Sequence, residues 1–229
     1  MALPQTHNNL QVIAIDGPAG AGKSTVAKKL AKILNLSYLD TGAMYRALTL
    51  KALRQKMDLT NEAALAALAE KTDIDFKNMP DGSLNIILDG EDVSQAIRTL
   101  EVTNNTFYTA RAPQVRAIMV RAQQLIGTRR ALVGDGRDLG TVVFPKADYK
   151  FYIDADINER CGRRLRELRA TGQEVDEQQL LAEMKDRDQK DFSRTVGPLK
   201  KADDAIVIDS SGLSVEGTVD VIIKYIKIN

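Results

Sequence analysis

Five short runs of apolar residues recur along the chain, and stretches with a helical pattern separate them. Each run is rich in Val, Ile or Leu and ends in an aspartate: residues 12–16, 36–40, 131–135, 150–154 and 205–209. Such runs alternating with amphipathic helices are typical of a parallel sheet that is buried on both faces. The sequence therefore predicts an α/β fold, a five-stranded parallel sheet flanked by helices, with a functional site at the carboxyl ends of the strands.

A different pattern interrupts this alternation between residues 58 and 130. A helix over residues 62–71 is followed by two alternating apolar segments, 74–76 and 84–88, with the turn signal Pro80-Asp-Gly82 between them. This pattern predicts an antiparallel hairpin in an inserted subdomain. A further helical stretch, residues 113–125, carries Arg116 and Arg121.

Composition narrows the class of protein. The 229 residues carry a net charge of +1, so no global basic field points to nucleic acid, and no apolar stretch approaches the length of a membrane span. The N-terminal residues lack the basic start and apolar segment of a secretory signal. With Cys161 as the single cysteine, an intramolecular disulfide is impossible, so we expect a reducing, cytoplasmic location.

Histidine chemistry is also disfavoured. The only histidine, His7, lies in the polar N-terminal segment ahead of the first predicted strand. A histidine general base in the core and a histidine-rich zinc site are therefore both disfavoured. Carboxylates and arginines must carry the chemistry.

The segment directly after the first predicted strand matches GxxxxGK[ST] at every fixed position. It reads Gly17, Pro18, Ala19, Gly20, Ala21, Gly22, Lys23, Ser24 and Thr25, and a predicted helix begins at Lys23. In such a loop backbone N–H groups surround phosphates, the lysine reaches the β- and γ-phosphates, and the hydroxyl after it binds Mg²⁺. The alternative is a glycine-rich turn without a ligand, but the strand before it and the helix after it favour an ATP-binding loop.

A polar aromatic residue and an arginine follow the second predicted strand. Asp40-Thr41-Gly-Ala-Met-Tyr45-Arg46 is a sharp turn into a helix, and Tyr45 and Arg46 could cover a ring and hold a phosphate. The alternative is structural: Asp40 caps the helix, Tyr45 fills the core and Arg46 is solvated.

The third strand leads into a segment with two aspartates on either side of an arginine. In Gly134-Asp135-Gly136-Arg137-Asp138, Arg137 could bind phosphate oxygens, Asp138 could hold Arg137 or a sugar hydroxyl, and Asp135 could orient Mg²⁺-bound water. An ordinary Asp-Gly turn is the alternative.

Two later helical segments are rich in arginine. Arg160, Arg163 and Arg164 fall on one predicted helix face, beside the apolar positions Leu165 and Leu168. In the second segment Arg187, Asp191 and Arg194 are spaced as one stripe of a helix. A solvated basic face and an ion-pair ladder would account for these patterns. The functional alternative is a lid whose arginines close over the transferring phosphoryl group.

Taken together, these segments resemble the bacterial-type cytidylate kinases, which are P-loop nucleoside monophosphate kinases. The motifs GPAGAGKS, DTGAMYR, PQVR, GDGRDLGTVVFP, RDQKDFSR and PLKKADDAIVIDS carry the resemblance, in order and spacing, from about Gln11 onward. The resemblance implies transfer of the γ-phosphoryl group of ATP to CMP or dCMP. It further implies a single domain over residues 10–229, with a core of 10–57 and 129–229, a monophosphate-binding insert of about 58–128 and a lid of about 158–194.

Individual roles carry over by position. By resemblance, residues 17–25 and the lid residues Arg160, Arg163 and Arg164 bind ATP. The CMP-binding and phosphate-clamping positions are Thr41, Tyr45, Arg46, Arg116, Arg137, Asp138, Arg187, Asp191 and Arg194. The catalytic positions among all of these are Lys23, Arg137, Asp138, Arg187 and Arg194, and Ser24 and Asp135 are the expected Mg²⁺ positions. We expect a monomer.

One position departs from the family pattern. Where these kinases usually have a serine that contacts the nucleoside, ahead of the PxVR motif, this chain has Phe107. Thr106, Thr109 or a water molecule could replace that contact.

Other readings of the phosphate loop remain open on the sequence alone. A kinase acting on a hydroxyl group, as sugar and shikimate kinases do, could use Asp138 or Asp40 as a base, but it would not need so many arginines on the acceptor side. A nucleotide-dependent switch is disfavoured because the chain has no NKxD motif. A monophosphate acceptor suits the residues best, since its nucleophilic oxygen is already charged at neutral pH.

Overall fold

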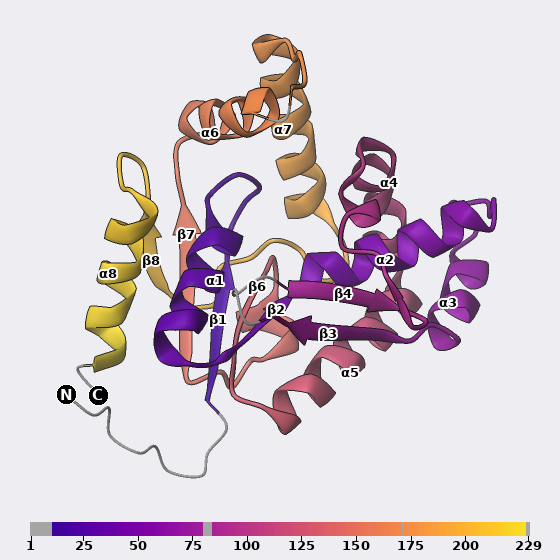
Figure 1. Ribbon diagram of the computed structural model, residues 1–229, viewed down its shortest axis with the longest axis horizontal. Helices are drawn as coiled ribbons and strands as arrows, with labels where there is room; N and C mark the ends of the chain where they lie inside the picture. Colours follow the sequence, from indigo (N-terminus) through magenta and orange to yellow (C-terminus); the bar gives the residue numbers. More distant parts are fainter. Residues whose placement is uncertain (1–10, 80–83, 171, 228–229) are drawn as a thin grey trace.

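The main sheet has five parallel strands, as the apolar runs predict. The computed structural model describes residues 11–79, 84–170 and 172–227. The strands are β1 (Val12–Asp16), β2 (Ser37–Asp40), β6 (Leu132–Gly136), β7 (Tyr149–Asp154) and β8 (Ile206–Asp209), in the order β2-β6-β1-β7-β8. The α/β fold class is confirmed. Because β1 is central, the glycine-rich loop that follows it lies in the middle of the carboxyl edge of the sheet (Figure 1).

Eight α-helices surround the two sheets in the part of the chain that the structure describes. They are α1 (Lys23–Leu34), α2 (Thr41–Arg54), α3 (Glu62–Glu70), α4 (Leu100–Arg111), α5 (Pro113–Arg129), α6 (Ile157–Ala170), α7 (Glu177–Ser193) and α8 (Val215–Lys227). A 3₁₀ turn (Ala96–Arg98) precedes α4, and a π-helix, η2 (Leu139–Val143), follows β6. In Figure 1, α8 lies beside α1, whereas α6 and α7 stand beyond the carboxyl edge of the sheet.

Helix α4 is an element that the apolar pattern does not reveal. The side chain of Thr99 caps it by accepting from the N–H of Val102, and Pro113 then begins α5 at a position that needs no N–H donor. α4 packs against α2 and α5. The insert thus contains the helices α3, α4 and α5 as well as the predicted hairpin, and α4 is the helix that the sequence pattern did not predict.

A second, antiparallel sheet confirms the strands of that hairpin. β3 (Ile74–Asn78) pairs with β4 (Leu84–Leu88), which in turn pairs with the short β5 (Glu91–Asp92). The predicted turn Pro80-Asp-Gly82 lies outside the described residues. Along β4 the residues Leu84, Ile86 and Leu88 are buried and the two between them are partly exposed, which is the alternation of a sheet with one face on the core.

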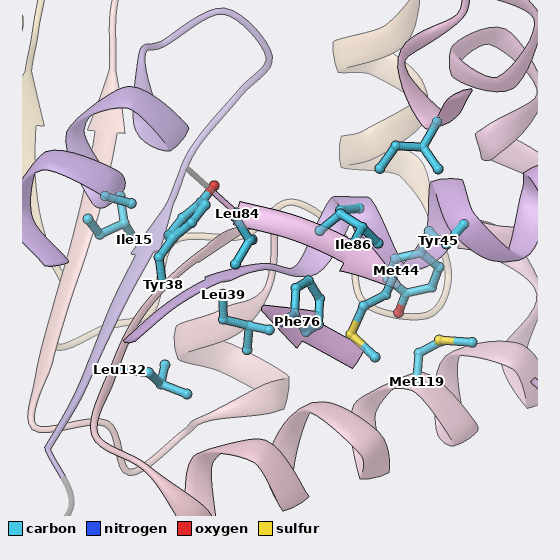
Figure 2. Close-up of a cluster of buried hydrophobic side chains, with 14 of the residues drawn as sticks. Ile15, Tyr38, Leu39, Met44, Tyr45, Phe76, Leu84, Ile86, Met119 and Leu132 are labelled. Carbon is cyan, nitrogen blue, oxygen red and sulfur yellow. The ribbon is translucent and has the colours of Figure 1, made fainter. Parts of the chain in front are cut away.

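One continuous hydrophobic core joins the two sheets. Figure 2 shows Phe76 and Ile86 of the small sheet close to Leu39 of β2 and Met44 of α2, and Met119 of α5 belongs to the same cluster. The insert therefore shares its core with the parallel sheet.

Helices α6 and α7 have a small core of their own. Cys161, Leu165 and Leu168 of α6 pack against Leu180 and Met184 of α7. The single cysteine is thus a buried packing residue, and Leu165 and Leu168 form the apolar stripe that their spacing predicts. Within the described part of the chain, no helix is both long and apolar enough to cross a membrane.

Candidate active site

The glycines after β1 let the backbone follow a path that a side chain would block. Gly17 has φ +147°, and a Cβ there would lie 2.0 Å from the carbonyl oxygen of Ile153. Gly22, at the N-cap of α1, has φ +86° and gives the helix no side-chain cap. The N–H groups of the first turn of α1 are therefore left without a capping side chain, at the positive end of the helix dipole. This geometry suits an anion at the loop.

Lys23 lies under this loop. Its side chain is almost fully buried, with the residue 5% exposed, and Nζ donates to the carbonyl oxygen of Pro18 at 2.6 Å. Burial and the positive charge of Arg137 lower the pKa of Lys23 to about 7, against the attraction of Asp135 and Asp16. A bound polyphosphate would supply the negative charge that favours the ammonium form.

Asp135 organises the floor of the site at the end of β6. Its carboxylate accepts from Ser24 Oγ at 2.7 Å and from the Tyr38 hydroxyl at 2.5 Å, and its backbone carbonyl accepts from Thr41 Oγ1 at 2.7 Å. Burial, together with the charge of Asp40, raises the pKa of Asp135. The two predicted metal positions, Ser24 and Asp135, are therefore in direct contact. The hydroxyl of Thr41, a position predicted to bind CMP, donates to a backbone carbonyl oxygen of the protein.

In the segment after β2, Asp40 both caps helix α2 and forms an ion pair with Arg46. Asp40 caps α2, accepting from the N–H of Ala43 at 2.8 Å, and the same carboxylate accepts from Arg46 Nη2 at 2.8 Å. Burial alone would raise the pKa of Asp40, but Arg46 and the helix N–H hold it below its usual range. Tyr45 is buried, and Arg116 lies over its ring at 5.4 Å. The capping alternative thus holds for Asp40, while Arg46 is ion-paired and mostly buried.

A buried ion pair joins the insert to the segment after β6. Arg116 of α5 contacts the carboxylate of Asp138, and its Nη1 donates to the carbonyl oxygen of Ala110 at 3.1 Å. Burial raises the pKa of Asp138, and Arg116 and Arg194 oppose that shift. Next to this pair, Arg137 Nε donates to Asp191 of α7 at 2.8 Å.

The predicted stripe on α7 needs a correction at its end. The helix ends at Ser193, and Arg194 has an extended ψ of 134° just beyond it. Arg194 still lies 3.8 Å from Asp191, because the side chain folds back into the site, where only 6% of it is exposed. Its Nε and Nη2 are buried without a hydrogen-bond partner among the described residues. Such free donors are suited to an acceptor from a ligand.

Arg187 is the exposed member of this group. It lies within electrostatic reach of Arg46, Arg137 and Arg164, and of Asp191. The structure therefore brings arginines from α2, α5, α7 and the β6 loop to one side of the phosphate loop. Four of these arginines (Arg46, Arg116, Arg137 and Arg194) pair with three aspartates (Asp40, Asp138 and Asp191). Arg187 adds a further positive charge without an ion pair among the described residues, so the group carries excess positive charge.

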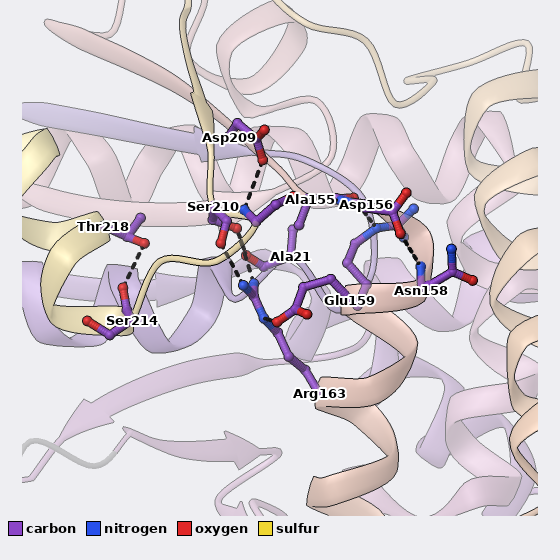
Figure 3. Close-up of polar contacts among 12 residues, drawn as sticks. Ala21, Ala155, Asp156, Asn158, Glu159, Arg163, Asp209, Ser210, Ser214 and Thr218 are labelled. Carbon is purple, nitrogen blue, oxygen red and sulfur yellow. Dashed lines mark hydrogen bonds and ion pairs between the residues drawn. The ribbon is translucent and has the colours of Figure 1, made fainter.

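The three arginines of α6 have different partners. Arg160 is buried and donates to Asp188 of α7 at 2.7 Å and to the carbonyl oxygen of Ala19 at 2.9 Å. Arg163 donates to Ser210 after β8, to Oγ at 3.1 Å and to the carbonyl oxygen at 2.6 Å (Figure 3). Arg164 is paired with Glu167 near the surface. Arg160 therefore ties α6 and α7 to the phosphate loop.

Asp16 is a residue of the site that the sequence interpretation missed. Its carboxylate accepts from the N–H groups of Leu139 at 2.8 Å and Gly140 at 2.7 Å. Burial raises the pKa of Asp16 to about 6, against the pull of these two N–H groups. The available signal was its position, since it is the aspartate at the end of the strand that leads into the phosphate loop.

Comparison with known proteins identifies the family of this site. The family model described as cytidylate kinase matches residues 13–228. The chain belongs to the cytidylate kinase family. The cytidylate kinase of Desulforamulus reducens is 49% identical over 94% of this chain and 96% of its own length, and that of Clostridioides difficile is 45% identical over 95% and 98%. The family membership makes the chain a nucleoside monophosphate kinase, an enzyme class whose phosphate donor is ATP.

A solved structure agrees in fold. An uncharacterised protein from Eubacterium ventriosum aligns with a TM-score of 0.55 at 17% identity, covering 96% of this chain and all of that one. At that identity the likeness concerns the fold alone.

Phe107, the departure from the family pattern, lies on α4. Its partly buried ring meets Tyr108 edge-on, with centroids 5.9 Å apart, and the guanidinium of Arg111 lies 5.2 Å from its centroid. Lys190 of α7 approaches the same ring at 5.6 Å. Phe107 therefore connects the insert to the helix that carries Arg187 and Asp191 by a cation–π contact.

Proposed function

We propose that this member of the cytidylate kinase family transfers the γ-phosphoryl group of ATP to CMP and dCMP, giving ADP with CDP or dCDP. The observation that carries the proposal is the group of five arginines beside the phosphate loop, of which four pair with only three aspartates and Arg187 has no ion pair among the described residues. Excess positive charge suits two phosphate-bearing nucleotides better than an acceptor hydroxyl.

The acceptor chemistry needs little from the protein beyond positioning. A phosphate monoester has a second pKa of about 6, so its attacking oxygen is already charged at neutral pH. No base is needed, which agrees with the engagement of Asp138 by Arg116 and of Asp40 by Arg46. Lys23, the loop N–H groups and the arginines would hold donor and acceptor in line and offset the charge on the transferring group.

Ser24 and Asp135 are suited to hold Mg²⁺. Mg²⁺ prefers oxygen ligands and usually keeps water and substrate phosphates, with only one or two protein oxygens. The Ser24 hydroxyl and the Asp135 carboxylate, 2.7 Å apart, provide such a pair of oxygens next to the phosphate loop. Among the described residues no group of three or more His, Cys, Asp or Glu side chains could hold a metal alone. Bound Mg²⁺ would neutralise phosphate charge, and its binding would depend on the nucleotide.

Helices α6 and α7 would act as the lid. They have their own small core and reach the rest of the protein through polar contacts, including those of Arg160 and Arg163. A pair of this kind can move as a unit and bring Arg187 over the phosphates, so that water is excluded. In this arrangement residues 58–128 bind the monophosphate and residues 10–57 and 129–229 form the core.

A test of phosphoryl transfer is the balance of products. Purified protein with Mg-ATP and CMP should release ADP and CDP in equal amounts, with negligible ADP when CMP is omitted. ADP release that is independent of CMP would point to a nucleotide-driven switch and would contradict the proposal.

Phe107 is expected to influence the choice between ribose and deoxyribose. In Phe107→Ser a hydroxyl returns to the position where the family contacts the nucleoside, so the ratio of kcat/KM for CMP to that for dCMP should change by about three- to tenfold, the size of one neutral hydrogen bond. Phe107→Leu is the matched control, because it removes the ring and adds no hydroxyl. Equal effects of Phe107→Ser on the two acceptors would refute this expectation.

A further inference from the structure

The side chain of Asp16 connects the two halves of the site. Asp16 is the last residue of β1 and is only 4% exposed, and Gly17 of the phosphate loop follows it directly. Both carboxylate oxygens are used, Oδ1 by the N–H of Leu139 and Oδ2 by the N–H of Gly140. The backbone of Asp16 thus continues into the phosphate loop, and its side chain binds the segment that follows β6.

The segment that Asp16 binds contains Arg137 and Asp138. On one side of these two residues, Gly136 lies opposite Asp16 in the β1–β6 ladder. On the other side, the amides of Leu139 and Gly140 are bound to the Asp16 carboxylate, and the side chain of Leu139 is fully buried. Arg137 and Asp138 are therefore a two-residue span that is held at both ends by the same residue.

The position of this span determines the geometry of the proposed acceptor site, because both of its residues form ion pairs there. Arg137 donates to Asp191 on α7, and Asp138 pairs with Arg116 on α5. A shift at Leu139 would move both ion pairs together, and the two pairs come from the lid helix and the insert. Misplacement of about 1 Å in such a site can cost about 100-fold in rate.

We propose that Asp16 is a positioning residue that fixes the Arg137–Asp138 span, and thereby the acceptor site, relative to the phosphate loop. The proposal rests on the proposed function. It assigns to Asp16 no contact with either substrate.

Asp16→Asn is the informative variant because it preserves size while changing one oxygen. The new NH₂ group cannot accept a hydrogen bond, so one of the two amides, Leu139 or Gly140, loses its partner and faces a donor instead. Asp148→Asn is the matched control. The exposed Asp148 carboxylate also accepts from a backbone amide of β1, that of Val12 at 2.7 Å, but at the opposite end of the strand.

The affinities for acceptor and donor separate a positioning role from a general loss of structure. In Asp16→Asn we expect the Kd for CMP, measured by calorimetry without ATP, to rise about 10- to 100-fold and kcat to fall with it. The affinity for ATP should change much less than that for CMP, because both carboxylate oxygens of Asp16 bind the amides of residues 139 and 140 and not the phosphate loop. Asp148→Asn should leave both affinities and kcat at wild-type values.

Hydrogen exchange tests the structural premise without any activity. The amides of Leu139 and Gly140 should exchange faster in Asp16→Asn than in the wild type, while those of β1 keep their protection. Unchanged exchange at these two amides, or equal weakening of CMP and ATP, would overturn the proposal for Asp16. If wild-type protein neither bound nor phosphorylated CMP, the proposed function itself would fail, whatever the exchange result.

Discussion

Arg187→Ala is expected to lower kcat about 10³-fold, the scale of a lost arginine that stabilises the transferring phosphoryl group. Arg187 is exposed and makes no hydrogen bond or ion pair with another described residue, so its loss should not lower the thermal unfolding temperature. Its positive charge faces Arg137 and Arg46, an arrangement that becomes favourable only when anionic phosphates bind. Steady-state kinetics with saturating Mg-ATP and CMP measure the effect.

Arg194→Ala is the companion test of the same clamp, and a comparable loss of kcat is expected. Its guanidinium is buried beside Asp191 with two unpartnered nitrogens, so an effect on stability is also expected and has to be measured in parallel. Lys185→Ala, an exposed cation on the same helix, is the control and should retain wild-type kcat. Wild-type kcat in both Arg187→Ala and Arg194→Ala would rule out the clamp.

Lys23→Met is expected to lower kcat about 10²- to 10³-fold, the usual cost of removing one preorganised charged donor. Methionine matches the lysine in length, and the variant removes a buried ammonium, so the protein should stay folded. Lys32→Met, at the exposed far end of α1, is the control. Activity of Lys23→Met within about twofold of the wild type would show that the loop does not bind the phosphates in the proposed way.

The parallel sheet could be predicted from the sequence because its signal is local. Each run of Val, Ile and Leu is a strand buried on both faces, and all five strands lie within a residue of their predicted ends. Helix α4 was not predicted because its buried residues are Val102 and the polar Thr109, which do not form an apolar stripe, and the helix packs against α2 and α5.

The composition of the site was accessible from motifs, but the partners of its side chains were not. The contact of Ser24 with Asp135 follows from two strands ending at one edge, which topology alone predicts. The hydrogen-bond partners of Arg160 and Arg163 lie on α7 and on the loop after β8. The spacing of residues along one helix does not tell where those other segments lie. Asp16 was missed because a bond between a side chain and the backbone 123 residues away leaves no spacing pattern.

The most direct test of the proposed function is a comparison of acceptors. With Mg-ATP as donor, kcat/KM should be measured for CMP, dCMP, UMP, AMP and shikimate against a blank without acceptor. The site geometry and the family membership predict strong turnover with CMP and dCMP and little with AMP or shikimate. Efficient phosphorylation of shikimate, or ADP release that no acceptor stimulates, would contradict the assignment of the arginine-rich half of the site to a nucleoside monophosphate.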